Sequence, residues 1–346
     1  MNKAFFRAAA ALLAVLCVVG CHRRPLFEPS ELVKISVEID VDNISNITCD
    51  IYNDDPNLGT RNISTDMMRV MVYDPDNGKL LTQSFISDKT INEKGHEVIS
   101  GTLQIGAGDF DFLPYNFDTP DTFVKNENEE GGITAYTSEI PAALKESYTK
   151  AADFAGLKTF YEPDHFFVAQ EHNYHIGLRD TLVVIETAAR TVVDTYYIQI
   201  PVEGLPAGTR AFGVISGLSP EIAFGTKTRS NNASGVYFEM IKSTDPRLEG
   251  ENKDVLCGLF NTFGKIDAAS SDVRFTVYVD DGRGNSIQQK DVNLDAIFKT
   301  ENATKHHWLL IDDLWTIITP DTPGVSGGGF QPSVEDWEEE EGGITL

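Results

Sequence analysis

Residues 68–81 read MRVMVYDPDNGKLL, and this stretch decides the fold class. An apolar run enters Asp74-Pro75-Asp76-Asn77-Gly78, and a second apolar segment leaves it. Pro, Asp, Asn and Gly are the residues of tight turns, so the stretch predicts a β-hairpin. Residues 275–289, FTVYVDDGRGNSIQQ, repeat the order of a Val-Tyr strand, an Asp/Gly/Asn turn and a polar return strand. The echo is weak by itself, but it suggests two similar β-sandwich domains in tandem.

Other segments carry the same strand signal. Residues 32–41, LVKISVEIDV, alternate apolar and polar side chains, which is typical of a half-buried strand. Further strands are predicted at 98–105, 110–115, 165–170, 182–186, 191–200, 211–215, 235–241, 254–260 and 274–279. Helix is expected only at 142–157 and for a turn or two in 294–300. The predicted fold class is therefore all-β, with two tandem β-sandwich domains and little helix.

The N-terminus has the pattern of a processing signal. Lys3 and Arg7 precede an apolar run at 8–19, which is shorter than the roughly 20 residues of a membrane-spanning helix. The run ends in Val18-Val19-Gly20-Cys21. This sequence resembles a bacterial lipobox, in which the cysteine is lipidated and the chain is cut just before it. Cys21 is therefore the predicted lipid attachment site. A plain signal peptide with a chance cysteine is the alternative.

Charge and cysteine content limit the classes of function. The formal net charge is −25, which repels nucleic acid, so nucleic-acid binding is not expected. If Cys17 leaves with the signal and Cys21 carries lipid, Cys49 and Cys257 remain. A disulfide between them is conceivable in an exported protein. We expect instead two small apolar side chains in different domains.

No catalytic, metal or cofactor site is predicted, apart from the covalent lipid on Cys21. The chain has no P-loop, and no glycine motif follows a predicted strand and opens a helix, so an enzyme is not expected. His172 and His175 lie in strand-like sequence, where a spacing of three puts them on opposite faces. Asp74, Asp76 and Asn77 lack the spacing of a calcium loop. Several aromatic residues are either sugar-stacking or core side chains, and sequence leaves both readings open: Tyr115, Phe117, Tyr136, Tyr148, Tyr161, Tyr196 and Tyr197.

Residues 103–124, LQIGAGDFDFLPYNFDTPDTFV, are more specific than composition. A strand, a glycine turn, the alternating aromatics Phe110, Phe112 and Tyr115, and then Asn116 follow one another. This order resembles the N-terminal domain of fimbrillin-like outer-membrane lipoproteins of Bacteroides and relatives. The lipobox with its leader HRRPLFEP and the Gly-rich end of the chain are similar to that group as well. The resemblance is closer to a domain-of-unknown-function family within the group than to the major stalk fimbrillins.

The resemblance implies a fold and a mode of assembly. Fimbrillin-type proteins are exported lipoproteins made of two transthyretin-like, Greek-key β-sandwiches. Stalk subunits lose an N-terminal segment to an arginine-specific protease, and a neighbour's C-terminal strand fills the resulting groove. Anchor subunits keep their lipid. Arg61 and Arg190 are the arginines considered for such cleavage. Ile344, Thr345 and Leu346 are a candidate donor strand, but the acidic run 338–341 resists burial and favours an edge strand on the chain's own second domain.

The predicted organisation has five parts. Residues 1–20 form a lipoprotein signal peptide and residues 21–30 a lipidated tether. An N-terminal sandwich at 31–188, a C-terminal sandwich at 189–318 and a Gly-rich, acidic tail with a short strand at 319–346 follow. The expected function is a lipid-anchored anchor or accessory subunit of fimbriae at the outer membrane, with the leaflet left open. The alternative is a surface glycan-binding lipoprotein that supports polysaccharide capture.

Overall fold

The computed structural model describes residues 31–40, 64–142, 157–177, 182–205, 209–250, 253–266, 272–280 and 286–317. The predicted signal peptide, tether and tail lie outside these residues, as does nearly all of the helix expected at 142–157. Within the described ranges, no helix is long and apolar enough to cross a membrane.

The first sandwich contains nine strands in the order β3-β2-β6-β10-β12-β1-β5-β4, with β11 paired to β6. Their bounds are β1 (Glu31–Ile39), β2 (Met68–Tyr73), β3 (Leu80–Ile86), β4 (Asp88–Ile91), β5 (Glu97–Ile105), β6 (Gly108–Asn116), β10 (Phe167–Val168), β11 (Glu171–Ile176) and β12 (Val183–Thr191). The two-residue strand β10 pairs with both β6 and β12 and so joins the two faces. Alternation along β1 buries Val33, Ile35, Val37 and Ile39 between those faces.

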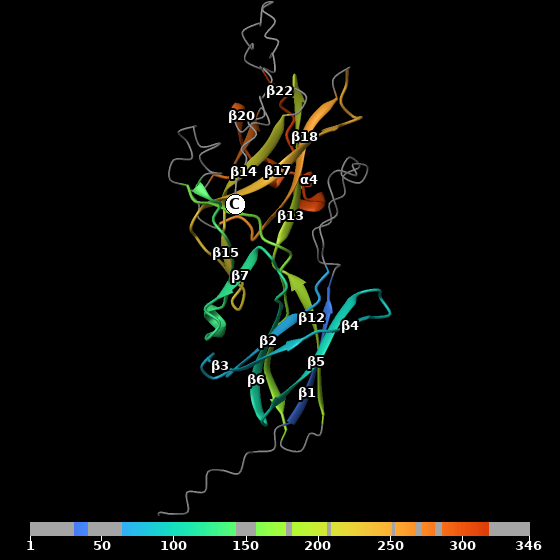
Figure 1. Cartoon of the computed structure of the whole chain (residues 1–346), viewed down its shortest axis with the longest axis vertical. Coiled ribbons are helices and arrows are strands. Elements are labelled where there is room, and N and C mark those ends of the chain that lie inside the picture. The colour runs from blue at the N-terminus through green and yellow to red at the C-terminus, as the bar shows by residue number, and fades with distance from the viewer. Residues whose placement is uncertain are drawn as a thin grey trace, which may run out of the picture.

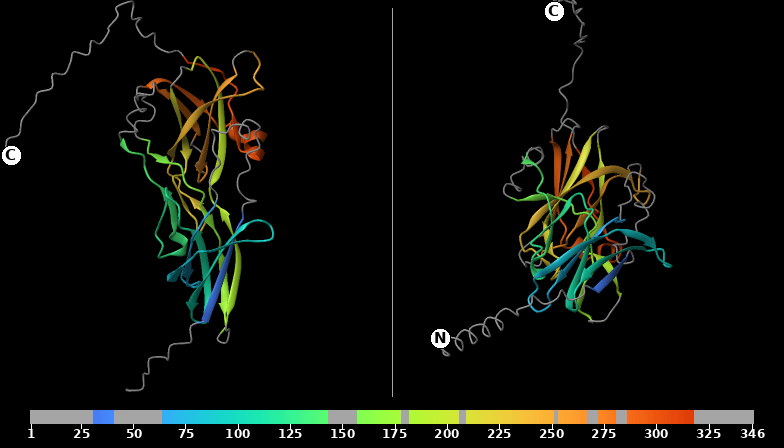
Figure 2. Two further views of the ribbon diagram at one scale, coloured as in Figure 1. Left: turned by 45° about the vertical axis from the view of Figure 1, so that its right-hand side comes forward. Right: turned by 60° about the horizontal axis from the view of Figure 1, so that its bottom comes forward.

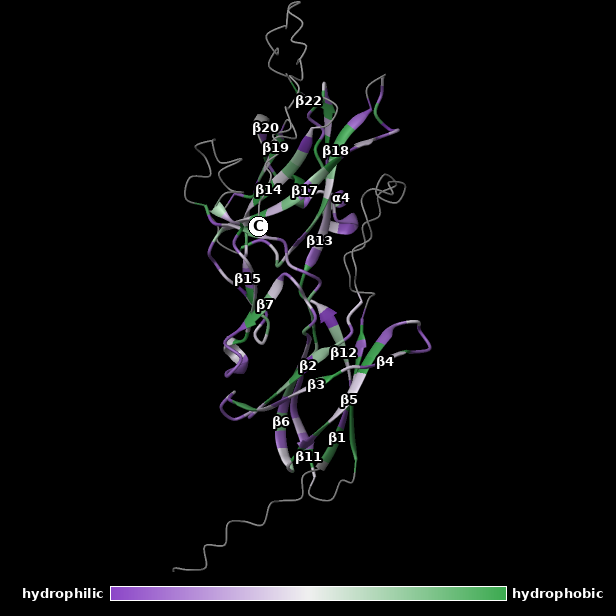
Figure 3. Cartoon of the chain, in the orientation of Figure 1, coloured by the Kyte–Doolittle hydropathy of each residue, from purple (hydrophilic) through white to green (hydrophobic). Residues whose placement is uncertain are grey.

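The second sandwich has the order β20-β19-β14-β17-β18-β13-β21, with β22 on β13 and β9 on β17. Its strands are β9 (Thr159–Tyr161), β13 (Asp194–Glu203), β14 (Arg210–Leu218), β17 (Ser234–Thr244), β18 (Asp254–Thr262), β19 (Arg274–Asp280), β20 (Ser286–Asn293), β21 (Trp308–Leu310) and β22 (Trp315–Thr316). The long strand β17 pairs with β14 through Met240 and with β18 from Ile241, so it passes from one face to the other. Apolar residues alternate with polar ones along many strands of both sandwiches (Figure 3).

A third, four-stranded sheet crosses between the sandwiches in the order β16-β15-β8-β7. Strands β7 (Thr122–Lys125) and β8 (Thr134–Thr137) come from the first part of the chain, and β15 (Glu221–Ala223) and β16 (Thr228–Arg229) come from the second. Beside it lies a buried cluster, here called the junction core: Met71, Tyr73, Leu113, Tyr115, Ile133, Ala135, Phe166, Val168, Val193, Ile222, Phe224 and Phe263. The two sandwiches therefore share buried apolar surface rather than a bare linker.

Hydrogen bonds from buried amide side chains reinforce this junction. Asn116 ends β6, and its side chain donates to the carbonyl of His165 at 3.0 Å and accepts from the N–H of Phe167 at 2.7 Å. On the other side, the Asn261 side chain donates to the carbonyl of Pro163 at 2.8 Å. The segment leading into β10 is thus held from both sandwiches, because each buried amide satisfies a backbone group that water cannot reach.

The predicted fold class is confirmed: the described chain is nearly all β and forms two sandwiches. The two echoing hairpins occupy equivalent places, since β3-β2 and β20-β19 each lie at the outer edge of their sheet. The predicted boundary at 188/189 falls inside β12, whose residues up to Thr191 still pair in the first sandwich. A 3₁₀ turn (Ile297–Lys299) lies within the range 294–300 where a helical turn is expected, and α4 (Glu301–His306) follows it.

The body is long, and the described chain begins and ends at its opposite ends (Figure 1, Figure 2). β1 runs parallel to β12, so Glu31 lies at the far end of the first sandwich and Ile39 lies near the junction. β13 leads away from the junction, and β22 pairs with its last residues, Val202 and Glu203. Ile317 follows there and donates its N–H to the carbonyl of Glu203.

We expect the junction core to hold the two sandwiches together. Phe224 is fully buried, with its ring 5.3 Å from Tyr115 and 5.2 Å from Phe166. Phe224→Ala should lower the free energy of unfolding by about 3–5 kcal/mol, because a buried ring is replaced by a cavity. Urea denaturation followed by circular dichroism measures this. Phe123→Ala, at a 42% exposed ring of β7, is the matched control and should change it by only about 0.5 kcal/mol. Equal decreases in the free energy of unfolding in both variants would contradict the view that the junction core holds the sandwiches together.

Candidate functional site

Strand β1 lies in the middle of the first sandwich rather than at an edge. It pairs in parallel with β12 from Val33 to Ile39 and antiparallel with β5 from Glu31 to Glu38. Its inward side chains have no exposed surface, whereas Lys34 points to solvent. A force applied to the N-terminal end of β1 would therefore act against two hydrogen-bonded ladders and a buried apolar face at once.

The predicted lipid site precedes this strand closely in the sequence. Cys21 and the lipobox residues Val18, Val19 and Gly20 lie outside the described residues. Nine residues lie between Cys21 and Glu31, so ten Cα–Cα steps join them. A chain of that length spans at most about 35 Å when fully extended. A lipid on Cys21 would hence keep the Glu31 end of the body close to a membrane surface.

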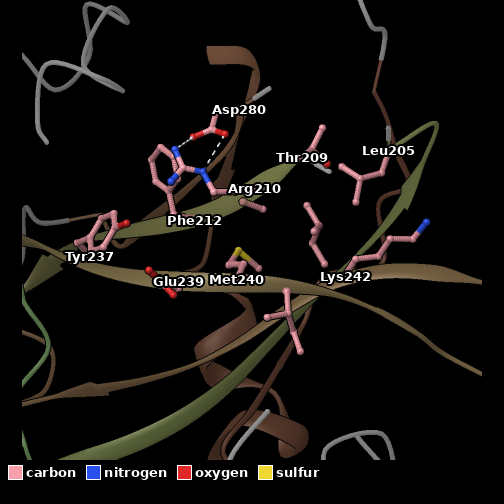
Figure 4. Close-up of a pocket in the computed structure, with 12 residues that line it drawn as sticks. Leu205, Thr209, Arg210, Phe212, Tyr237, Glu239, Met240, Lys242 and Asp280 are labelled. Carbon is pink, nitrogen blue, oxygen red and sulfur yellow. Dashed lines mark hydrogen bonds and ion pairs between the residues drawn. The ribbon is translucent and has the colours of Figure 1, made fainter. Parts of the chain in front are cut away.

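A cavity of about 340 Å³ lies at the other end of the molecule, where β13 ends and β14 begins (Figure 4). We call it the distal cavity. Its lining comes from β14, β17, β18 and β19 and the ends of their loops: Leu205, Thr209, Arg210, Ala211, Phe212, Tyr237, Glu239, Met240, Ile241, Lys242, Leu256 and Asp280. Apolar side chains from the sandwich interior and charged side chains from the outer face meet at its mouth.

An ion pair stands on one wall of the distal cavity. Arg210 donates from Nε and Nη2 to the two carboxylate oxygens of Asp280, at 3.3 and 3.0 Å. The bonds to Asp280 raise the pKa of Arg210. Burial, with the charge of Glu239 as a second cause, raises the pKa of Tyr237 to about 12, so its hydroxyl is neutral near pH 7. The wall thus presents a fixed guanidinium and a phenol donor beside apolar surface.

The distal cavity also borders backbone that has a strand partner on one side only. Strand β17 pairs with β14 as far as Met240 and continues to Thr244. From Ile241 to Thr244 its pairing among the described strands is with β18 alone. Ile241 and Lys242 line the cavity beside this edge. An unpaired strand edge next to an apolar hollow is the arrangement that accepts an added β-strand.

Exposed aromatic rings gather on the first sandwich around a second hollow of about 380 Å³, lined in part by Arg69, Phe117 and Phe123. Phe85 and Phe117 are 49% and 43% exposed, with ring centroids 5.2 Å apart. The guanidinium of Arg69 lies 5.7 and 5.2 Å from these two centroids. Because a cation already covers these rings in part, they offer less open face for stacking on a sugar.

The aromatic candidates named from the sequence do not form one platform. Tyr115 and Tyr197 are fully buried core residues, and Phe117 is exposed. Tyr136, Tyr161 and Tyr196 are half-buried, each against another ring. Tyr148 lies outside the described residues. Most of this set therefore packs inside the protein.

The structure separates the two histidines considered together. His175 approaches Asp109, with Nδ1 2.7 Å from Oδ1, whereas His172 faces Asp111 and Glu130. The predicted turn chemistry of 74–78 is also present: the N–H of Asp76 and the side-chain amide of Asn77 both donate to the Asp74 carboxylate. Cys257 is a fully buried thiol on β18, and Cys49 lies outside the described residues.

The two arginines considered as cleavage sites differ. Arg190 lies within β12 opposite Val168, and its Nε lies 3.2 Å from Oδ2 of Asp40. A protease needs an extended segment free of neighbours, and a paired strand does not supply one. Arg61 lies outside the described residues, between β1 and β2 in the sequence, and the candidate donor residues Ile344, Thr345 and Leu346 also lie outside them.

Sequence reasoning missed the distal cavity entirely. Its residues come from positions 205–212, 237–242, 256 and 280, which share no motif. The turn residues Gly204 and 280–285 mark only where strands end. The change of partner along β17, which opens the cavity, depends on strand register and has no local signature.

Comparisons with known proteins show which family and which folds this chain resembles. The family model described as "Domain of unknown function (DUF5119)" matches residues 20–239. The chain is 21% identical to the "Putative fimbrium anchoring subunit Fim4B" of Bacteroides ovatus, with 95% of each chain covered. The crystal structure of a "putative adhesin" from the same species superposes with a TM-score of 0.55 at 17% identity, over 85% of this chain and 95% of that one. The fold is shared, and the resemblance to fimbrillin-like proteins is confirmed.

The central position of β1 predicts how strongly its side chains hold the first sandwich. Ile35→Ala should lower the free energy of unfolding by about 2–5 kcal/mol, because its fully buried side chain leaves a cavity. Lys34→Ala, one residue away on the exposed face, should change it by about 0.5 kcal/mol or less. Urea denaturation of both variants measures the difference. A large loss at Lys34 with none at Ile35 would contradict the assigned face of β1.

Proposed function

This chain belongs to the family described as Domain of unknown function (DUF5119), and we propose that it is an anchoring or accessory subunit of a fimbrium, held at the outer membrane by a lipid on Cys21. The proposal rests on two features that lie far apart on the body, the start of β1 and the distal cavity. β1 begins at one end of the long body, and β13, whose end borders the distal cavity, runs toward the other. A subunit that joins a membrane to a filament needs its two attachment points apart.

The Bacteroides ovatus protein that matches this chain over almost its whole length supports this role, because its name is "Putative fimbrium anchoring subunit Fim4B". Such a protein is structural rather than catalytic, and it belongs to the cell envelope. The contact with other fimbrial subunits is the proposed activity.

The end of the body at which β1 begins has the structure expected of an attachment that bears tension. A lipid on Cys21 would transmit force through nine residues into β1, and β1 would resist along both of its ladders. Force along a strand axis loads many hydrogen bonds together instead of opening them one at a time. Retaining β1 is therefore what an anchor requires, whereas a stalk subunit must release its first segment to open a groove.

The distal end suits a protein partner. A strand from a neighbouring subunit would pair with the free side of Ile241–Thr244 and place alternate side chains in the cavity. Arg210 and the Tyr237 hydroxyl offer donors to an acidic or carbonyl-rich strand. The chain's own short strands β21 and β22 already lie along β13, so they do not fill this edge.

Glycan capture is the second candidate, and the exposed rings Phe85, Phe117 and Phe123 are its only support among the described residues. Arg69 covers two of these rings, which weakens them as a stacking surface. Binding of the purified protein to a broad glycan array, lost in Phe117→Ala, would favour this candidate over the anchor.

The lipid is tested by Cys21→Ala in the cells that make the protein. We expect palmitate labelling to vanish and fimbriae to detach into the medium, because the link to the membrane is gone. Cys257→Ala is the matched control: it removes a buried thiol from β18 and should leave labelling and attachment unchanged. Labelled Cys21→Ala protein would exclude the lipid site, and filaments of unchanged length and attachment would exclude the anchor.

The distal cavity is tested by reversing a charge on its wall. Arg210→Glu places a carboxylate beside Asp280 and Glu239, so binding of purified fimbrial subunits should weaken at least tenfold. The fold should survive, since the Arg210 side chain is 65% exposed. Arg274→Glu, at the exposed opposite end of the same sheet, is the control and should bind as the unmodified protein does. Equal affinity of both variants for the fimbrial subunits would show that the partner binds at another site.

A further inference from the structure

Three metal-ligating side chains from distant parts of the chain meet on the first sandwich. Asp111 comes from β6, His172 from β11, and Glu130 from the 3₁₀ turn (Glu130–Gly132) between β7 and β8. Nδ1 of His172 lies 3.6 Å from Oδ1 of Asp111 and 3.5 Å from Oε1 of Glu130. One ligand atom from each of the three lies within 4.8 Å of the others.

Burying these three side chains together without a cation costs free energy. The Asp111 side chain is 9% exposed and accepts the N–H of Asn173 at 2.7 Å. Oε1 of Glu130 is fully buried and has no hydrogen-bond donor among the described residues. Burial and the neighbouring Asp111 raise the pKa of Glu130. Two buried carboxylates repel each other unless a proton or a cation lies between them.

The distances suit ligands of one ion better than hydrogen bonds. At 3.5 and 3.6 Å, the contacts of His172 are longer than a good N–H···O bond. An ion with bonds of about 2.0–2.2 Å holds neighbouring ligand atoms roughly 3.0–3.5 Å apart. The two contacts of His172 would therefore need to close by only a few tenths of an ångström, and the ligand atoms of Asp111 and Glu130 lie within 4.8 Å of each other.

Local backbone geometry aims His172 at the carboxylates. Asn173 has a left-handed φ of 52°, and the register of β11 against β6 shifts between Glu171 and Tyr174. A bulge of this kind re-aims the side chains beside it. His175 continues past the bulge and faces Asp109 instead, with one carboxylate and exposed surroundings.

We propose that Asp111, Glu130 and His172 bind one divalent transition-metal ion of the Zn²⁺ class. The imidazole nitrogen favours an ion of the Zn²⁺ class, which also accepts carboxylate oxygens, whereas Ca²⁺ and Mg²⁺ take oxygen ligands. Three protein ligands leave a fourth position for water, and His172, at 54% exposure, puts that position on the solvent side.

The ion would act as a staple at the junction of the two sandwiches. The N–H of Glu130 donates to the carbonyl of Gly78 in the β2–β3 turn. Its carbonyl lies so close to Gly225 that a Cβ there would meet it at 1.9 Å. Glu130 thus sits between the first sandwich and the sheet that crosses to the second. Binding at Glu130 would join that crossing to β6 and β11 and add the binding free energy to folding.

The test uses the full chain, purified in detergent and stripped with EDTA, and titrated with Zn²⁺ by calorimetry. We expect one site per chain with micromolar affinity and a higher melting temperature when it is filled. His172→Ala should weaken binding at least tenfold, and Glu130→Gln should do the same while conserving shape. His175→Ala removes a more exposed histidine of the same strand and should leave affinity within twofold. Ca²⁺ at the same concentration should not compete.

Two results would overturn the site. No Zn²⁺ binding by the unmodified chain, together with a higher melting temperature in Glu130→Gln, would mean that the carboxylates share a proton. Zn²⁺ binding that is equal in the unmodified chain, His172→Ala and Glu130→Gln would place the ion on other residues.

Discussion

The junction core is the interaction on which the rest of this structure depends. Each sandwich is a closed unit with its own apolar interior, and a flexible link between the two would leave their ends free to approach. Instead, Phe224 from the second part of the chain packs against Tyr115 and Phe166 from the first. The crossing sheet then ties β7 and β8 to β15. One stiff, elongated body results, and its two ends are held apart (Figure 1).

Because the body is stiff, it keeps the two end sites apart. A strand held on both sides, β1, lies next to the predicted lipid site, and a cavity beside a one-sided strand edge lies at the opposite end. Backbone hydrogen bonding between strands has opposite roles at the two ends. At one end β1 has a strand partner on both sides from Val33 to Glu38 and resists removal, and at the other a strand edge has a partner on one side among the described strands. The charge of −25 keeps such a surface from nonspecific contact with nucleic acid and anionic lipid.

Local sequence predicted the elements well where one face is buried and the turn residues are strong. The hairpin of residues 68–86 and the alternating strand at the start of the described chain are the clearest cases. It missed short strands such as β7 and β9, and β9 joins a sheet of the other sandwich. The predicted boundary at 188/189 falls inside β12, because pairing with β10 continues that strand through Arg190 to Thr191.

By itself the sequence determined the strands, their buried faces, the hairpin turns and the predicted lipid signal, because each depends on residues a few positions apart. Side-chain alternation and turn chemistry act at that range. Tertiary structure alone decided the strand order, the junction core, the distal cavity and the meeting of Asp111, Glu130 and His172. These depend on register between segments that are far apart in the chain. A shift of one residue in that register turns every side chain to the opposite face, and no local pattern reports it.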